Sequence, residues 1–322
     1  MSSHLLRTKL SQLKELTSGL VKGIDLVLLI PLAFAILLRI IGIQFGLPFS
    51  YHFDETTYTG AALNLGAVKI GPQINPTGFS NILFVEYAVY FVIARLLGVI
   101  HSLSDFARLY RVDPTLFVLL GRLTSALFGV LNVWVVYWLG TKTRSRAVGL
   151  LAAAFLAFGF LHVRDSHYSV PDIPMAFFAS LSVLLCVLSV TRNSSRLKYL
   201  AAFTAGLTIT IKWSAAPIVV PLILILLYDS WQPGRRFRIG EGIPKQALWM
   251  LLSLAGGFFV GGFELFLAPG TYLNYMLYEL RAGEQGGFYF WQVDTLPGWL
   301  FYIKTFFIGL GIPFTLLAIA GA

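Results

Sequence analysis

Charged residues and cysteine are both scarce in this chain of 322 residues. Only 12% of the residues are charged and the mean hydropathy is +0.76, whereas a soluble globular domain has about 25% charged residues. The one cysteine, Cys186, excludes an internal disulfide and a thiolate metal cluster, and we expect it to pack within an apolar run. The composition therefore predicts a polytopic membrane protein.

The sequence also lacks the strand-like alternation of polar and apolar residues. Its apolar runs are instead long and continuous, which in a bilayer favours helices. They fall at about 24–43, 79–100, 115–140, 147–163, 173–190, 199–211, 214–228, 246–268 and 298–318. We therefore expect an all-α transmembrane helix bundle.

The two ends of the chain differ in charge. Residues 1–23 contain four Lys or Arg residues, and the run after them is too long for a signal-peptide core and has no small-residue cleavage site. We expect this run to remain as an anchor, with 1–23 in the cytoplasm and 24–322 as one transmembrane module. The last run, from Trp299 to Ala322, has no basic flank, so we expect the chain to be truncated there.

The net charge of +9 does not indicate a nucleic-acid partner, because the basic residues stand in short clusters between apolar runs. All of these clusters face the cytoplasm if the run at 79–100 lies along the membrane surface. Glu86 and Arg95 favour that arrangement, since each would cost about 2.5 to 3.5 kcal/mol at the centre of a spanning helix. We therefore predict about eight spans and an outer loop at 44–114 with interfacial helices near 54–65 and 79–100.

This topology places three loops on the outer face, at 44–115, 162–174 and 269–298, together with a short turn at 212–214. Most of the unusual polar residues of the chain lie in these segments. Ionisable side chains that gather on one side of a membrane protein indicate a functional site.

Three motifs in these segments occur in a specific order. Asp54-Glu55 follows the first span, Arg164 to Pro174 precede a later span, and Thr210-Ile211-Lys212-Trp213 forms the short turn. In this order, residues from about 24 to 230 resemble the membrane glycosyltransferases of the GT-C superfamily. The similarity is greatest to the branch with protein O-mannosyltransferases and lipid A aminoarabinose transferases.

The resemblance implies an enzyme that moves a hexosyl or pentosyl group from a polyprenyl- or dolichyl-phosphate carrier to an acceptor at the outer face, in the plasma membrane. Such a transfer needs a base for the acceptor hydroxyl and positive charge for the departing phosphate. We expect Asp54 to be the base, at the start of a short helix where backbone N–H groups favour a carboxylate. Helix capping is its alternative role. Glu55 is the second catalytic candidate and would orient the acceptor or the surroundings of Asp54.

The predicted substrate-binding residues come from the other outer segments: Asp172, Arg164, Lys212, His167, Tyr168, Arg281 and Glu284. Arg164 and Lys212 are the main candidates for the lipid phosphate, with snorkelling to lipid headgroups as their alternative role. Arg39 and Arg122 are weaker candidates of the same kind.

The carboxylates of Asp54 and Asp172 could together hold a divalent cation, with His52 or His167 completing the shell. The sequence does not decide whether a metal is needed.

A secondary transporter or lipid flippase is the alternative function. Such proteins place ionisable residues near the bilayer midplane on broken helices, and often show repeated halves. No clear internal repeat is visible, and the strongest polar clusters lie in loops on one face. The glycosyltransferase interpretation is therefore favoured.

Overall fold

A computed structural model describes residues 25–67, 77–231, 245–284, 303, 307–309 and 311–321. Within these ranges every regular element is helical, which confirms the predicted all-α membrane fold. The predicted cytoplasmic segment 1–23 lies outside the described residues.

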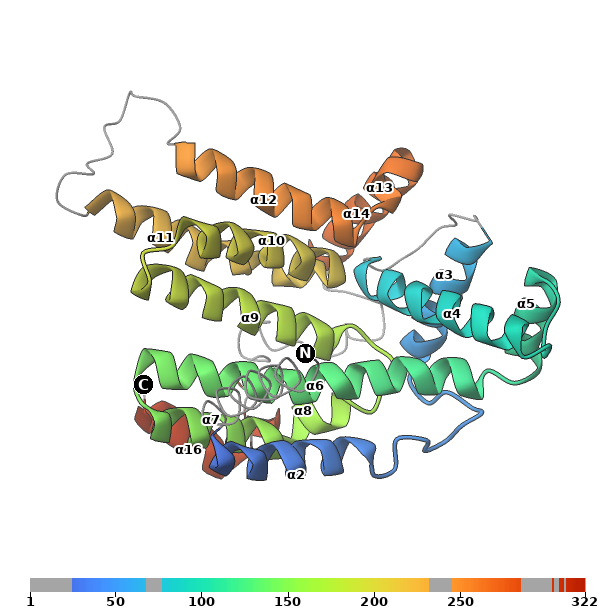
Figure 1. Ribbon diagram of the computed structural model, residues 1–322, viewed down its shortest axis with the longest axis horizontal. Helices are drawn as coiled ribbons and strands as arrows, with labels where there is room; N and C mark the ends of the chain where they lie inside the picture. The colour runs from blue at the N-terminus through green and yellow to red at the C-terminus, as the bar shows by residue number, and fades with distance from the viewer. Residues whose placement is uncertain are drawn as a thin grey trace, which may run out of the picture.

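The main body is a bundle of long helices that run side by side (Figure 1). α10 packs against α9 and α12, while α6 packs against α7, α9 and α2. Ser145 caps the start of α7 by accepting a hydrogen bond from the N–H of Val148. The bounds of these helices are α2 Leu29–Ile40, α6 Thr115–Thr143, α7 Arg146–Phe158, α9 Asp172–Thr191, α10 Ser195–Ile211 and α12 Lys245–Gly261.

Small residues let α10 and α12 approach each other closely. A Cβ atom added to Gly206 would lie 2.1 Å from the carbonyl oxygen of Leu254, and one added to Gly257 would lie 1.9 Å from that of Phe203. Glycine at both positions therefore permits backbone contact between the two helices, as small residues do in membrane helix pairs.

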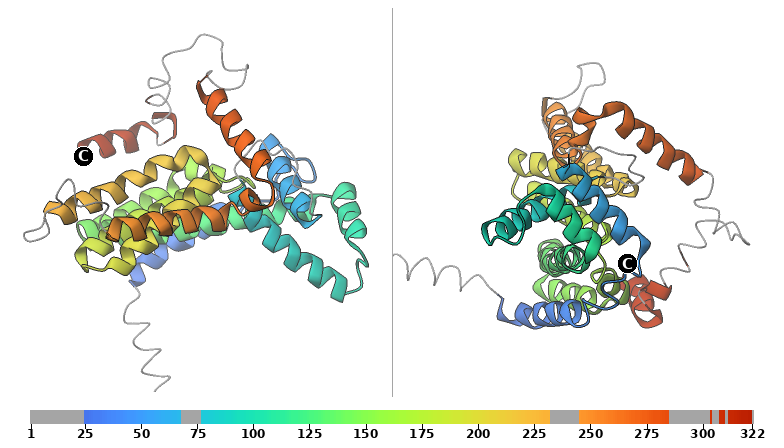
Figure 2. Two further views of the ribbon diagram at one scale, coloured as in Figure 1. Left: turned by 90° about the horizontal axis from the view of Figure 1, so that it is seen from above. Right: turned by 90° about the vertical axis from the view of Figure 1, so that its right-hand side faces the viewer.

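Three helices of the first large loop cover one end of the bundle: α3 Phe53–Gly66, α4 Gly78–Leu96 and α5 Leu103–Val112. They enclose a core of aromatic and aliphatic side chains that includes Phe79, Tyr87 and Phe117. The predicted helices near 54–65 and 79–100 are therefore present as α3 and α4. α4 runs obliquely to the bundle (Figure 2).

Among the described residues, α4, α6 and α9 are the helices long and apolar enough to cross a membrane by length and composition. Length and composition therefore do not show whether α4 crosses the membrane or lies along its surface. The interfacial placement of α4 stays a prediction, and so does the number of spans. Arg95 is exposed, but Glu86 is only half-exposed and accepts a hydrogen bond from Thr124 of α6. A helix at the membrane surface would keep both side chains in water, but Glu86 is half-buried against α6.

Two apolar runs that were predicted as single helices are interrupted. The run at 147–163 breaks at Gly159 into α7 and the short helix α8 Phe160–Asp165, and the run at 246–268 breaks after α12 into α13 Glu264–Leu267. The turn at 212–214 is present, because α10 ends at Ile211 and a 3-10 helix, η2, follows. The remaining elements are η1 Leu26–Leu28, η2 Trp213–Ile218, α11 Val219–Trp231, α14 Pro269–Glu284 and α16 Ile312–Gly321.

Arg39 stabilises the break between α7 and α8. Its guanidinium is fully buried and donates hydrogen bonds to the carbonyl oxygens of Leu156 and Ala157, which lie in the last turn of α7. Further bonds reach Ser166 and Nδ1 of His162. A lipid phosphate cannot reach a side chain enclosed in this way, so the prediction of Arg39 as a phosphate ligand was wrong.

Candidate active site

Asp54 lies in the first turn of α3, at the end of the bundle covered by the first loop. His52 is the N-cap of that helix, and its Nδ1 accepts a hydrogen bond from the backbone N–H of Asp54 at 3.3 Å. Because His52 fills the capping position, the Asp54 carboxylate remains available for other contacts. Its side chain is 31% exposed, and its Oδ2 lies 3.9 Å from Nδ1 of His52.

Lys212 and Asp172 form an ion pair beside Asp54. Nζ of Lys212 donates to Oδ1 of Asp172 at 2.6 Å. Asp172 begins α9 and Lys212 follows α10, so the antiparallel pairing of these helices brings the two residues to the same end of the bundle. Both side chains are more than one third exposed, 37% for Lys212 and 38% for Asp172. The pair is therefore open to a ligand.

Arg164 and Asp165 add a second ion pair. Nε and NH2 of Arg164 both lie 2.7 Å from Oδ1 of Asp165, and the arginine side chain is 49% exposed. Burial raises the pKa of Asp165, while the neighbouring Arg164 lowers it and the charge of Asp172 raises it. The two ion pairs therefore belong to one electrostatic cluster.

The same cluster acts on Asp54. Burial raises the pKa of Asp54 above that of a free aspartate; the charges of His52 and Lys212 lower it, and that of Asp172 raises it. Charges influence one another in this way only over short distances. We call Asp54, His52, Asp172, Lys212, Arg164 and Asp165 the Asp54 cluster.

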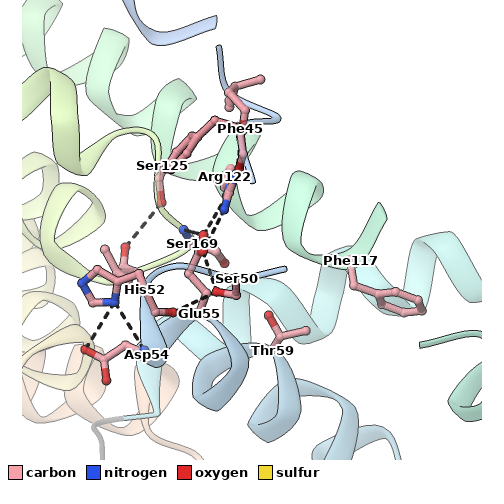
Figure 3. Close-up of polar contacts among 12 residues, drawn as sticks. Phe45, Ser50, His52, Asp54, Glu55, Thr59, Phe117, Arg122, Ser125 and Ser169 are labelled. Carbon is pink, nitrogen blue, oxygen red and sulfur yellow. Dashed lines mark hydrogen bonds and ion pairs between the residues drawn. The ribbon is translucent and has the colours of Figure 1, made fainter. Parts of the chain in front are cut away.

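Glu55 occupies a different environment from Asp54, although the two are adjacent in sequence. Its side chain is fully buried, and its two oxygens accept hydrogen bonds from Nε and NH2 of Arg122 at 2.8 and 2.9 Å. The backbone N–H of Ser169 and the hydroxyl of Ser50 add two more, both at 2.8 Å. The two acids point to different sides of α3 (Figure 3).

The pair of Glu55 and Arg122 holds three segments together. Arg122 also donates to the carbonyl oxygens of Ile43 and Phe45, so the ion pair joins the first loop, α6 and the loop after α8. Burial alone would raise the pKa of Glu55, but the hydrogen bonds from Arg122, Ser169 and Ser50 outweigh burial and lower it. The side chains of Glu55 and Arg122 are both fully buried in this structure. Glu55 therefore cannot contact a substrate directly, and Arg122 cannot contact a phosphate.

His167 and Tyr168 lie in the loop after α8. Both ring nitrogens of His167 face backbone carbonyl oxygens, those of Val163 at 2.8 Å and Ile41 at 3.0 Å. Both nitrogens face protein carbonyl oxygens in this structure, and metal binding by His167 stays a prediction. The ring of Tyr168 lies 5.0 Å from that of His52 and 5.5 Å from that of Phe45, so it forms an aromatic wall beside the Asp54 cluster.

The remaining candidates lie near the end of α14. Arg281 is exposed in the last turn of that helix, whereas Glu284 is its final residue and its side chain lies outside the described residues. No described contact connects either of them with the Asp54 cluster. Among the described side chains, no group of three or more His, Cys, Asp or Glu is arranged to hold a metal ion.

Comparison with known protein families assigns the chain to one of them. The family model of dolichyl-phosphate-mannose-protein mannosyltransferases matches residues 110–319, which is well over half of the chain. The chain belongs to this family. The matched region contains Asp165, Asp172 and Lys212, while Asp54 precedes it. The resemblance to protein O-mannosyltransferases is thereby confirmed.

One relative is longer than the part of it that this chain matches. A protein of Aquifex aeolicus (strain VF5), described as uncharacterized, is 26% identical over 195 residues, which are 59% of this chain and 38% of that protein. The chain therefore spans well under half the length of this relative.

Sequence reasoning missed three features of the site. It did not pair Lys212 with Asp172, it did not include Asp165 among the site residues, and it did not connect Glu55 with Arg122. A signal existed for the last pair, because Arg122 stands inside a long apolar run, where an ionised side chain needs a partner of opposite charge.

Proposed function

We propose that this family member is a membrane glycosyltransferase that moves a sugar from a polyprenyl phosphate, such as dolichyl phosphate, to an acceptor hydroxyl at the extracytoplasmic face. The observation that supports it most strongly is the Asp54 cluster. A half-buried carboxylate of raised pKa lies beside two exposed cationic side chains at one end of a membrane helix bundle.

Asp54 takes the proton of the acceptor hydroxyl in this proposal. The acceptor oxygen forms a bond to the anomeric carbon of the sugar while the bond from that carbon to the phosphate oxygen breaks. A raised pKa makes the ionised carboxylate a stronger base, and it remains ionised as long as the pH lies above that pKa. Positioned bases of this kind contribute about 10² to 10⁴ to a rate.

Lys212 and Arg164 stabilise the departing lipid phosphate. Each is now paired with one carboxylate, Asp172 or Asp165, and each is partly exposed, so both retain donors for phosphate oxygens. Arginine offers bidentate contacts and lysine a compact charge. The two aspartates keep the cations in place when no phosphate is bound.

Glu55 and Arg122 act as positioning residues. Their buried pair fixes the start of α3, and therefore the location of Asp54, relative to the loop at Ser169. Of the two roles predicted for Glu55, this is the orientation of the surroundings of Asp54.

The test is a transfer assay with purified protein in lipid nanodiscs. Dolichyl phosphate carrying radiolabelled mannose is incubated with the protein and with peptide or glycan acceptors. Release of unglycosylated dolichyl phosphate together with labelled acceptor supports the proposal. In a parallel assay with the protein in sealed vesicles, a transporter or flippase would move the lipid across the membrane and leave the sugar bonded to it. That result, without transfer in nanodiscs, would overturn the proposal.

A further inference from the structure

A second group of polar side chains is buried next to the Asp54 cluster. Glu264 begins α13 and is 1% exposed, and around it lie Thr77 and Asn81 at the start of α4, Trp213 of η2 and Tyr272 of α14. We call these five residues the Glu264 cluster. Four of them are more than nine-tenths buried: Thr77, Asn81, Glu264 and Tyr272.

The Glu264 cluster has more hydrogen-bonding atoms than partners for them. Nδ2 of Asn81 donates to Oε2 of Glu264 at 3.0 Å and to the carbonyl oxygen of Gly261 at 2.7 Å. Five other buried atoms find no hydrogen-bond partner among the described residues: Oγ1 of Thr77, Oδ1 of Asn81, Nε1 of Trp213, Oε1 of Glu264 and Oη of Tyr272. A buried polar atom without a partner costs about 1 to 3 kcal/mol, so five together indicate a missing ligand.

The fold brings these atoms together through close backbone contacts. A Cβ atom added to Gly78 would lie 2.8 Å from the backbone nitrogen of Ile211, so the start of α4 packs directly against the end of α10. A Cβ atom added to Gly262 would lie 2.8 Å from Oη of Tyr272. Glycine at 262 therefore lets the tyrosine hydroxyl pack directly against the backbone.

The cluster adjoins the proposed reaction site along the chain. Trp213 follows Lys212 directly, and its ring centroid lies 6.3 Å from that of Tyr272. The side chains of Thr77 and Trp213 both approach the Tyr272 hydroxyl, and Thr77 also approaches Glu264, but none of these approaches has hydrogen-bond geometry. The peptide bond between Lys212 and Trp213 thus connects the Asp54 cluster with the Glu264 cluster.

We propose that the Glu264 cluster binds the hydroxyl groups of the donor sugar. A sugar hydroxyl both donates and accepts hydrogen bonds, and the five unpartnered atoms include a pure donor, two carbonyl-type acceptors and two hydroxyls. The aromatic faces of Trp213 and Tyr272 add apolar surface for a sugar ring. This inference rests on the proposed function, since it assigns the sugar of the same lipid-linked donor.

Two other ligand classes fit less well. A phosphate would meet the Glu264 carboxylate, and no described cation forms an ion pair with that residue. A bare cation would meet the indole N–H of Trp213, which can only donate. A neutral polyol satisfies both kinds of atom.

The test compares the binding of dolichyl phosphate mannose and dolichyl phosphate to the full chain in nanodiscs. Tyr272→Phe removes only the unpartnered hydroxyl, so the fold should be retained or stabilised. Affinity for dolichyl phosphate mannose should fall about 3- to 10-fold, the worth of one neutral hydrogen bond. Affinity for dolichyl phosphate should stay unchanged.

Tyr87→Phe is the matched control, because the Tyr87 hydroxyl is equally buried but donates to the carbonyl oxygen of Phe117 at 3.0 Å. It should lower stability without changing either affinity. Glu264→Gln replaces one oxygen by an amide group that can only donate, so it should weaken dolichyl phosphate mannose about 3- to 10-fold and spare dolichyl phosphate.

The outcomes separate the two proposals. If the unchanged protein prefers the mannosylated lipid and Tyr272→Phe and Glu264→Gln keep that preference, the Glu264 cluster holds only water and the inference is wrong. If Tyr272→Phe instead destabilises the fold and weakens both lipids equally, the cluster is structural and the inference is again wrong. If the unchanged protein binds neither lipid, the proposed function itself fails.

Discussion

Replacing Arg122 by leucine removes the cation that contacts Glu55 and leaves a fully buried carboxylate with two hydrogen-bond donors, Ser50 and Ser169. The substitution also leaves the carbonyl oxygens of Ile43 and Phe45 without their guanidinium donor. Breaking a buried ion pair on one side costs about 3 to 5 kcal/mol, because the other charge stays buried and unpaired. We expect the free energy of unfolding to fall by about that amount.

The assay is a denaturant titration in mixed micelles, followed by tryptophan fluorescence. Arg146→Leu is the matched control, because Arg146 forms a similar bidentate pair with Asp25 at 2.6 and 2.7 Å but its side chain is 60% exposed. Asp25 is 10% exposed but keeps the hydroxyl of Tyr137 as a donor. A pair with one exposed partner contributes less than a fully buried pair, so this variant should lose clearly less stability than Arg122→Leu.

A double variant extends the Arg122 experiment. Adding Glu55→Gln to Arg122→Leu removes the stranded charge, and the double variant should therefore lose less stability than the sum of the two single changes. A loss of under about 1 kcal/mol for Arg122→Leu alone, as for a surface pair, would refute the argument that the pair fixes the first loop.

Two further predictions concern the pH profile and the topology. Because the pKa of Asp54 is raised, the transfer rate should fall with decreasing pH at a pH above the ordinary aspartate value of 3.8. Asp172→Asn removes a negative charge that raises this pKa and should move the acid limb of the profile to lower pH; Lys212→Ala removes a positive charge and should move it to higher pH. If the acid limbs do not move, or move in the opposite directions, the ionisation of Asp54 does not control the transfer rate. Cysteines placed at Lys142 and Arg196 should both react with labelling reagents from the cytoplasmic side, against little background from the buried Cys186; labelling of either from outside would contradict the placement of α4 at the interface.

Two of the three helices of the first loop, α3 and α4, and the site-bearing ends of α9 and α10 could be predicted from the sequence, whereas α5 was not predicted. Long apolar runs predict helices in a bilayer, and charged residues next to them mark the ends. Asp172 and Lys212 could be placed near each other on this basis, because one helical hairpin connects them. Their ion pair follows because this hairpin brings the start of α9 next to the end of α10.

The interior polar contacts could not be predicted in the same way. Glu55 and Arg122 are 67 residues apart, and nothing in their local sequence selects one partner over another. Glu264 stands within a predicted apolar span, and only the break after Gly261 places it against α4. Such contacts depend on how helices pack, which hydrophobic periodicity alone does not determine.

The central claim is that Asp54 is the base for sugar transfer. Asp54→Asn keeps the shape of the side chain and removes the base, and His52 still caps α3, so the stability of the fold should change little. Asp113→Asn is the matched control, because Asp113 lies before α6 and its Oδ1 accepts a hydrogen bond from the N–H of Thr115 at 2.9 Å, which asparagine can also accept.

The decisive measurement is the rate of mannose transfer from dolichyl phosphate mannose by these two variants, in a form of the protein shown to be active. We predict that Asp54→Asn lowers the rate by about 10² to 10⁴, while Asp113→Asn retains it. Transfer by Asp54→Asn at the rate of the unchanged protein would contradict the assignment of Asp54 as the base and reopen the transporter interpretation.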